Sequence, residues 1–248
     1  QSLGNLPGFS VMISDDPKLG NWEPVYRYYA DPSVLQDDDV IIKCDDDVVY
    51  LRGLGKLASF TREREHRGLV FPNMVNNVIG THWQLHDDMW KPSPDLLMNP
   101  TLSAIWLNRA EVDFAFMDGR PAKDPVGGMD SGWAESPTCA EAALRAFLQK
   151  PSRFTRNRLH EWRTPRRVSI NCFAIRGRDA QEIFPDVPWG DEVFLSQTIM
   201  GLKSWPASML MSCVAVHFAF SKQRTAGLDK DGSILRSFCE LAELEFAT

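Results

Sequence analysis

Three consecutive aspartates, Asp45 to Asp47, follow the apolar run Val40 to Lys43 (VIIK) after a single cysteine, and a second apolar run comes directly after them. Three adjacent carboxylates repel one another and lose solvation when a strand delivers them to one loop. A divalent cation is the economical compensation, because Asp oxygens are hard ligands that suit Mg²⁺ or Mn²⁺, and these ions often bridge substrate phosphates. The alternative is a solvated acidic turn, which rarely lies between two apolar runs. We therefore expect a cation site at this position.

Alternating short apolar runs and amphipathic stretches predict an α/β domain. Val40 to Lys43 is interpreted as a strand buried on both faces, and the crevice beyond the carboxyl ends of such strands is where ligands bind. Further strands are expected over 9–14, 69–72, 168–174 and 212–220, and helices over 21–30, 51–66, 138–150, 179–184, 191–200 and 233–246. A capping box of Thr138 and Glu141 is expected to open one helix. Without a repeat or a linker, residues 1–248 are predicted to form a single domain.

The charge balance, 27 Lys and Arg against 33 Asp and Glu, gives a net charge of −6. Without a basic block, this balance argues against nucleic acid as a partner. The five cysteines are widely spread and contain no C-x-x-C, so neither a disulfide framework nor a zinc knuckle is predicted. No apolar stretch is long enough to span a membrane, and the first ten residues lack the pattern of a signal peptide. We expect a cytoplasmic protein in a reducing compartment.

A second constellation of possible ligands is His82 and His86, whose i, i+4 spacing suits a zinc pair on one helix face, with Asp87 and Asp88 following. However, Trp83 stands where a zinc protease has its glutamate, and we interpret residues 81–90 as a loop on the acceptor side of a site. Six tryptophans could stack on sugar rings, although most tryptophans belong to cores; they are Trp22, Trp83, Trp90, Trp106, Trp133 and Trp189.

The segment Ile42 to Leu51 (IKCDDDVVYL) resembles the D-x-D motif of GT-A-fold glycosyltransferases that use nucleotide-sugar donors. Further segments are similar, in the same order, to a group of fungal, bacterial and large-virus proteins with a central DDD. They are 20–30 (GNWEPVYRYYA), 71–77 (FPNMVNN), 168–173 (VSINCF), 189–195 (WGDEVFL) and 216–224 (VHFAFSKQR). The resemblance runs from about Ile13 to Leu241 and implies a GT-A fold, a Rossmann-like mixed sheet flanked by helices.

The resemblance also implies roles for individual residues. Asp47 would coordinate the metal that holds the donor diphosphate, Mn²⁺ or Mg²⁺. Asp45 would contact the donor directly or through the metal, and Asp46 would reach sugar hydroxyls. GT-A enzymes often take a further ligand from near the carboxyl end, frequently a histidine, and His217 matches it; the alternative is an ordinary core histidine.

Lys222 and Arg224 follow His217 closely and would stabilise the leaving diphosphate; alternatively they are solvated surface charges. Asp191 and Glu192 are the candidates for the base that deprotonates the acceptor hydroxyl in an inverting reaction. In the common Glu-Asp-Val form the second acid is the base, and this chain reverses the two acids, so both stay candidates. The alternative is a pair of acids favoured by a helix dipole.

The sequence therefore predicts a metal-dependent glycosyltransferase that moves a hexosyl or pentosyl group from a nucleoside diphosphate sugar to a hydroxyl of a glycan, with inversion. Two alternatives stay open: a metal-dependent hydrolase that uses His82 and His86, and a non-enzymatic carbohydrate-binding module that uses its tryptophans. A GT-A domain normally begins with a strand that helps to bind the nucleobase, and this chain starts near the second strand, so that part of the donor pocket is not assigned.

Overall fold

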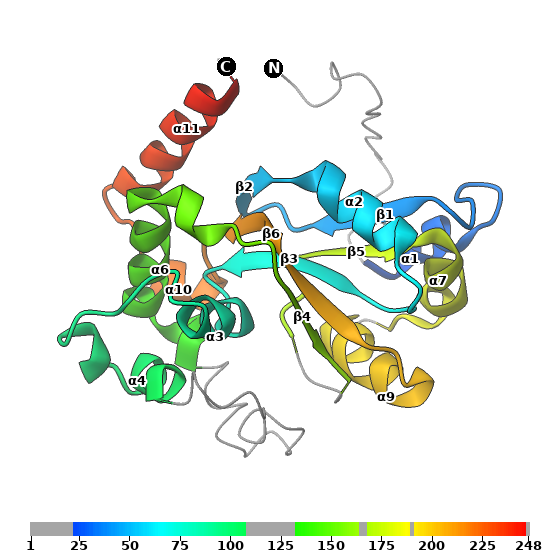
Figure 1. Ribbon diagram of the computed structural model, residues 1–248, viewed down its shortest axis with the longest axis horizontal. Helices are drawn as coiled ribbons and strands as arrows, with labels where there is room; N and C mark the ends of the chain where they lie inside the picture. Colours follow the sequence, from blue (N-terminus) through cyan, green and yellow to red (C-terminus); the bar gives the residue numbers. More distant parts are fainter. Residues whose placement is uncertain (1–21, 108–131, 164–167, 189–190, 247–248) are drawn as a thin grey trace.

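A computed structural model describes residues 22–107, 132–163, 168–188 and 191–246, and it shows a mixed six-stranded sheet with helices packed around it (Figure 1). The strands are β1 (Val40–Cys44), β2 (Val48–Arg52), β3 (Val70–Val75), β4 (Leu159–Trp162), β5 (Cys172–Arg176) and β6 (Ala207–His217). The main path through the sheet is β1-β5-β3-β6-β2, and β4 also pairs with β6. Among the described strands, only β3 and β6 pair in parallel, and the other pairs are antiparallel.

The acidic residues 45–47 form the whole connection between β1 and β2, although these strands stand at opposite ends of the path. Three residues can bridge two such strands only because the sheet curls into a nearly closed, barrel-like shape. Side chains of both strands accordingly pack on one small cluster of Met74, Cys172 and Ala215, one from each of β3, β5 and β6. The turn therefore crosses the ends of the strands between β1 and β2.

Alternate residues of the central strands face two different cores, as the pleat requires. Val70, Ala174 and Leu210 face a smaller cluster that includes Leu57 of α2 (Leu54–Glu63). Their neighbours Phe71 and Phe173 belong to the main core on the other face. In Figure 1, α2 lies over one side of the sheet, and the other helices group around its two ends.

The remaining helices are α1 (Trp22–Ala30), α3 (Val78–His86), α4 (Pro100–Leu107), α6 (Pro137–Gln149), α7 (Gly177–Ile183), α8 (Asp191–Val193), α9 (Ile199–Lys203), α10 (Ser221–Thr225) and α11 (Ser233–Phe246). A π-helical turn, η7 (Phe194–Thr198), joins α8 to α9. The short 3₁₀ turns are η3 (Leu96–Met98), η5 (Pro151–Phe154) and η6 (Phe184–Asp186). Among the described residues, no helix combines the length and the apolar character needed to cross a membrane.

The predicted α/β class, the strand at 40–43 and the helices at 21–30, 191–200 and 233–246 are confirmed within one or two residues at most ends. The prediction that Val40 to Lys43 is buried on both faces is wrong, because β1 is an edge strand and all five of its residues are half-buried. The strand expected over 9–14 lies outside the described residues. Strands β2 and β4 were not expected, and β6 begins five residues before the predicted start and ends at His217.

Two local predictions are corrected by the way helices begin. Residues 81–90 are not a loop, because α3 covers most of them and starts at Asn77, whose Oδ1 accepts from the N–H groups of Ile79 (3.0 Å) and Gly80 (3.2 Å). The cap of α6 is Ser136 and not Thr138: its Oγ accepts from the N–H of Cys139 at 3.2 Å, and Pro137 follows as the first helical residue.

Candidate functional site

One pocket of about 300 Å³ brings together four segments that are far apart in the sequence. The acidic turn 45–47 forms one wall, Asp191 and Glu192 at the start of α8 form another, and His217 at the end of β6 lies with Phe220 and Ser221. Ile170 and Asn171, which precede β5, and Lys43 of β1 complete the lining. Five carboxylates and one lysine therefore face the same space, which makes the pocket strongly favourable for a cation.

The acidic turn is fixed at both ends by backbone hydrogen bonds. The N–H of Asp45 donates to the carbonyl of Asn171 at 2.8 Å, and the N–H of Phe218 donates to the carbonyl of Asp47 at 2.8 Å. The turn closes on itself through the N–H of Val48, which donates to the carbonyl of Asp45 at 3.2 Å. The turn thus joins the beginning of β5 to the end of β6, and this holds the carboxylates next to His217.

The carboxylate of Asp45 is held by protein donors on both of its oxygens. The ammonium group of Lys43 pairs with Oδ1 and also donates to the carbonyl of Ile170 at 3.0 Å. The amide of Asn171 donates to Oδ2 at 3.2 Å. Asp45 is only 23 % exposed, so these contacts offset the desolvation of its charge. Asp46, the middle residue of the turn, is exposed at the pocket.

Asp47 and His217 form the closest pair of candidate metal ligands. Nε2 of His217 lies 3.2 Å from Oδ1 of Asp47, and both side chains are largely buried. This contact does not meet the geometry of a hydrogen bond, so Oδ1 of Asp47 is buried without a hydrogen-bond partner among the described residues, and Nδ1 on the other side of the His217 ring is too. Burial raises the pKa of Asp47, but His217 and the guanidinium of Arg224, 3.5 Å from Oδ2, outweigh it and hold the pKa below its ordinary value.

The separation of these two atoms suits a shared ion. In an octahedral site with bonds of about 2.1 Å, neighbouring ligand atoms lie roughly 3.0 Å apart. Asp47 and His217 therefore fit Mg²⁺ or Mn²⁺ as two adjacent ligands. Within the described ranges, no group of three or more His, Cys, Asp and Glu side chains is arranged to hold a metal ion. A bound ion would consequently depend on water or substrate oxygens for its remaining ligands.

The acids at the start of α8 are positioned from two sides. The hydroxyl of Tyr26 on α1 donates to Oδ2 of Asp191 at 2.9 Å. Burial of this phenol, and then the negative charge of Asp191, raise the pKa of Tyr26 far above its usual value, so it stays a donor. The carbonyl of Glu192 accepts from the Ser196 hydroxyl at 2.6 Å, inside the π-helical stretch. Trp189 and Gly190, which precede these acids, lie outside the described residues.

Lys222 and Arg224 have different ion-pair partners, although only one residue separates them in the sequence. Arg224 reaches Asp47, whereas the ammonium group of Lys222 pairs with Glu135, and neither partner of that pair lines the pocket. Lys222 is 67 % exposed, so the solvated-charge alternative describes it better than a place at the acidic turn.

Three residues of the site were not singled out from the sequence: Lys43, Asn171 and Tyr26. Each contacts one of the predicted carboxylates. Asn171 and Tyr26 lie within segments that carry the family resemblance, VSINCF and GNWEPVYRYYA, and Lys43 stands two residues before the aspartates. Their signal in the sequence is a side chain that can donate a hydrogen bond, placed in or next to a segment that carries the predicted carboxylates or the resemblance.

His82 and His86, whose spacing left a zinc pair open as an alternative, contact other partners in the structure. His82 is completely buried in α3 against Trp83, and Nδ1 of His86 lies 3.0 Å from Oδ1 of Asp87. The second oxygen of Asp87 lies 3.0 Å from Nε2 of His160, which stacks on Trp83. Arg158 also pairs with Asp87, whose carboxylate is 2 % exposed. Asp87 is thus the centre of a structural network between α3 and β4.

Most of the tryptophans considered for sugar stacking are core residues, as is usual for tryptophan. Trp83, Trp90 and Trp133 are between 0 and 7 % exposed. Nε1 of Trp133 donates to Oδ1 of Asn76 at 3.0 Å, within a buried network that also includes Gln223. Trp106 packs on the main core, and the ring of Trp22 lies outside the described residues.

No protein-family model, no curated protein and no solved structure matches the chain.

Proposed function

We propose that the protein is a metal-dependent glycosyltransferase with a GT-A-like arrangement. It would move a hexosyl or pentosyl group from a nucleoside diphosphate sugar to a hydroxyl of a glycan acceptor, with inversion. The observation that carries the proposal is the convergence of Asp45 to Asp47, Asp191, Glu192 and His217 in one pocket. These are the residues that the family resemblance assigns to metal, donor and base, and they come from three separate segments.

Asp47 and His217 would hold Mn²⁺ or Mg²⁺, and such an ion supplies charge stabilisation for the donor diphosphate. The buried Oδ1 of Asp47 without a hydrogen-bond partner supports this role, because burying a carboxylate oxygen without a donor is costly. Asp45, held by Lys43 and Asn171, would present its remaining lone pairs to the donor or to the ion. Asp46 is exposed at the same pocket and is assigned to the sugar hydroxyls.

Asp191 and Glu192 together supply the candidate base. Inverting transfer needs a carboxylate that accepts the proton of the acceptor hydroxyl as it attacks the anomeric carbon. Both acids line the pocket. They are far from the acidic turn in the sequence but share the pocket with it. The hydrogen bond from Tyr26 fixes the orientation of Asp191, so the acidic pair is held in place before an acceptor binds.

Arg224 is the cation assigned to the leaving diphosphate. Its guanidinium reaches Asp47 from outside and is 54 % exposed, so it could turn toward a donor diphosphate that a metal ion at Asp47 would hold. A fixed positive charge near the departing oxygens stabilises the charge that develops in the transition state. Lys222 pairs with Glu135 and would have to leave that partner to contribute.

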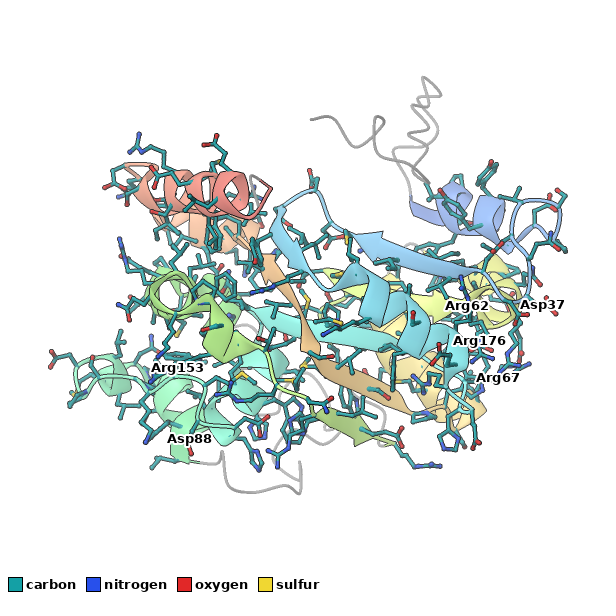
Figure 2. The ribbon with its side chains drawn as sticks, turned by 45° about the horizontal axis from the view of Figure 1, so that its top comes forward. Asp37, Arg62, Arg67, Asp88, Arg153 and Arg176 are labelled. Atoms are coloured by element: carbon teal, nitrogen blue, oxygen red, sulfur yellow. The ribbon has the colours of Figure 1, made fainter. Side chains whose placement is uncertain are left out.

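The decisive experiment is calorimetry of the purified chain against a panel of nucleoside diphosphate sugars, with and without Mn²⁺. We expect one or a few donors to bind only when Mn²⁺ is present, and Asp47→Ala to abolish both this binding and sugar transfer. Asp37→Ala is the matched control, since Asp37 is exposed at the end of the molecule where β1 begins (Figure 2). Full transfer activity in Asp47→Ala would refute the assignment of the site.

The same panel separates the alternatives. Zinc binding that depends on His82 and His86, with turnover of a phosphoester or an amide, would favour a hydrolase. Glycan binding without donor, metal or turnover would favour a carbohydrate-binding module. The burial of His82 and of three predicted stacking tryptophans gives both alternatives less support than the acidic pocket gives to glycosyl transfer.

A further inference from the structure

Two cysteines that are far apart in the sequence face each other next to the acidic turn. Cys44 ends β1 and Cys172 begins β5, and the strand register pairs them directly. Their sulfur atoms lie 3.3 Å apart, which is the contact of two thiols. The other three cysteines are not part of this pair: Cys139 and Cys213 are buried elsewhere, and Cys239 is exposed on α11. The sequence alone indicated no disulfide, since 127 residues lie between the two positions.

The backbone around this pair is suited to a cross-strand disulfide. Asp45 follows Cys44, and Asn171 precedes Cys172 on the opposite strand. The N–H of Asp45 donates to the carbonyl of Asn171. In an antiparallel pair this pattern makes Cys44 and Cys172 a non-hydrogen-bonded pair, in which the Cα atoms lie about 4.5 Å apart and the side chains are close. That separation lies within the range that disulfides accept. The sulfurs can therefore bond without a change of register.

The two thiols differ in how accessible they are to a small molecule from solvent. We therefore expect Cys44 to react before Cys172. Cys44 is half-buried and lines a groove of about 840 Å³ along the outer side of β1, together with Tyr29 and Ile42. Cys172 is fully buried in the small cluster with Met74 and Ala215. A small molecule that enters the groove reaches Cys44 first, and Cys172 is in place to attack the sulfur of Cys44 afterwards.

We propose that Cys44 and Cys172 form a reversible disulfide, made by exchange with a small disulfide such as oxidised glutathione. The Cys44 thiolate attacks one sulfur of the small disulfide, which breaks its S–S bond and releases one thiolate. Cys172, as its thiolate, then attacks the sulfur of Cys44 and displaces the second small thiolate. Two protein thiols are oxidised, one small disulfide is reduced to two thiols, and the two protons pass to the released thiolates.

The bond would fasten the strand ends that carry the acidic turn. Asp45 continues directly from Cys44, and Asn171, which holds both the N–H and the carboxylate of Asp45, directly precedes Cys172. The disulfide closes a long loop of the unfolded chain, and we expect it to raise the midpoint of thermal unfolding by roughly 5–10 °C. It also adds a covalent tie beside the hydrogen bonds that position Asp45. The inference does not depend on the proposed glycosyl transfer.

Mass spectrometry after titration with oxidised glutathione tests the inference. In the wild-type chain we expect the peptides that contain Cys44 and Cys172 to lose two hydrogens and to retain no glutathione, and a non-reducing peptide map to join Cys44 to Cys172, whatever glutathione the exposed Cys239 carries. In Cys172→Ser the reaction should stop at one glutathione on Cys44, and in Cys44→Ser neither position should react. Cys239→Ser is the control, and it should form the disulfide as the wild type does.

Two results would overturn the inference. The first is a wild-type chain in which Cys239 is glutathionylated while Cys44 and Cys172 both keep their thiols; this readout needs no variant, so it stands even if a cysteine variant folds poorly. The second is an oxidised chain that unfolds at or below the temperature of the reduced chain, because this would mean that the bond does not fit the native pairing of β1 with β5.

Discussion

The network around Asp87 allows a quantitative prediction. Asp87→Asn keeps the shape of the side chain but removes its charge and converts one acceptor oxygen into a donor. In the native chain Oδ1 contacts Nδ1 of His86 at 3.0 Å and also Arg158, and Oδ2 contacts Nε2 of His160 at 3.0 Å. The carboxylate is 2 % exposed, so water cannot replace a lost partner. After the substitution, either a donor faces the new amide nitrogen or one of the two imidazoles must present an acceptor nitrogen to it, which removes the hydrogen bond that this ring donates in the native chain.

The size of the effect follows from these contacts. A hydrogen bond between a charged group and a buried partner contributes about 1.5–3 kcal/mol. The pair with Arg158 adds at most about 1 kcal/mol, because that guanidinium is 53 % exposed and screened by water. We therefore expect Asp87→Asn to lower the free energy of unfolding by about 2–4 kcal/mol at pH 7. The adjacent Asp88→Asn should change it by less than about 0.5 kcal/mol, because Asp88 is 68 % exposed and asparagine accepts its φ of 51°.

The contribution of the Asp87 charge to the free energy of unfolding depends on pH, and its sign follows from the pKa of the carboxyl group. Burial raises the pKa of Asp87, but the hydrogen bonds from His160, His86 and Arg158 outweigh burial and hold the pKa well below the ordinary value of 3.8. A depressed pKa stabilises the folded state above the ordinary value, and this contribution is lost as the pH falls below about 4 toward the folded-state pKa. The difference between wild type and Asp87→Asn should therefore shrink in acid.

Urea unfolding of wild type, Asp87→Asn and Asp88→Asn, at pH 7 and at the lowest pH where the wild type is folded, measures these differences. Figure 2 shows Asp88 at the surface of the molecule, where a substitution reports only local charge. Equal stability of Asp87→Asn and wild type at pH 7, or a difference that stays constant into acid, would refute the argument.

Two further predictions concern the site and its support. Arg224→Met should weaken Mn²⁺-dependent donor binding about tenfold by calorimetry, whereas Lys222→Met should stay within about twofold because its partner is Glu135; equal losses would contradict the geometry. Gly80→Ala should cost about 3 kcal/mol in urea unfolding, since a Cβ there would lie 1.9 Å from the carbonyl oxygen of Met74. Gly55→Ala is its control in α2, where a Cβ meets nothing within 4 Å, and it should be neutral or slightly stabilising.

The strand and the turn that carry the acidic residues could be predicted because their signals are local. An apolar run that stops at three aspartates identifies both the end of β1 and the cluster of charge. His217 was also found, since it ends an apolar run of Val and Ala. The contacts of Asp47 with His217 and Arg224 then follow from the pairing of β2 with β6, which brings Val48 opposite His217.

The missed elements have signals that depend on partners elsewhere in the chain. Val48 to Arg52 is a strand of only five residues. Its last two residues also fit the helical spacing of the apolar residues that follow, so the helix predicted over 51–66 begins inside the strand. Glycine at position 80 lowers the helix propensity of this segment, yet the close approach of α3 to β3 requires a glycine there. Tertiary packing decided both cases, and no single segment contains that information.

The sheet order explains why the site is built from distant segments. Because β1 and β2 flank different strands and only three residues connect them, the connection must pass over the beginning of β5 and the end of β6. Any residue types placed there would meet Asn171 on one side and His217 on the other. Three aspartates at this crossing concentrate negative charge, which Lys43 meets at Asp45 and which His217 and Arg224 meet at Asp47. These groups do not balance the five carboxylates of the pocket, and this excess of negative charge is the electrostatic support for the divalent cation that we propose at Asp47 and His217.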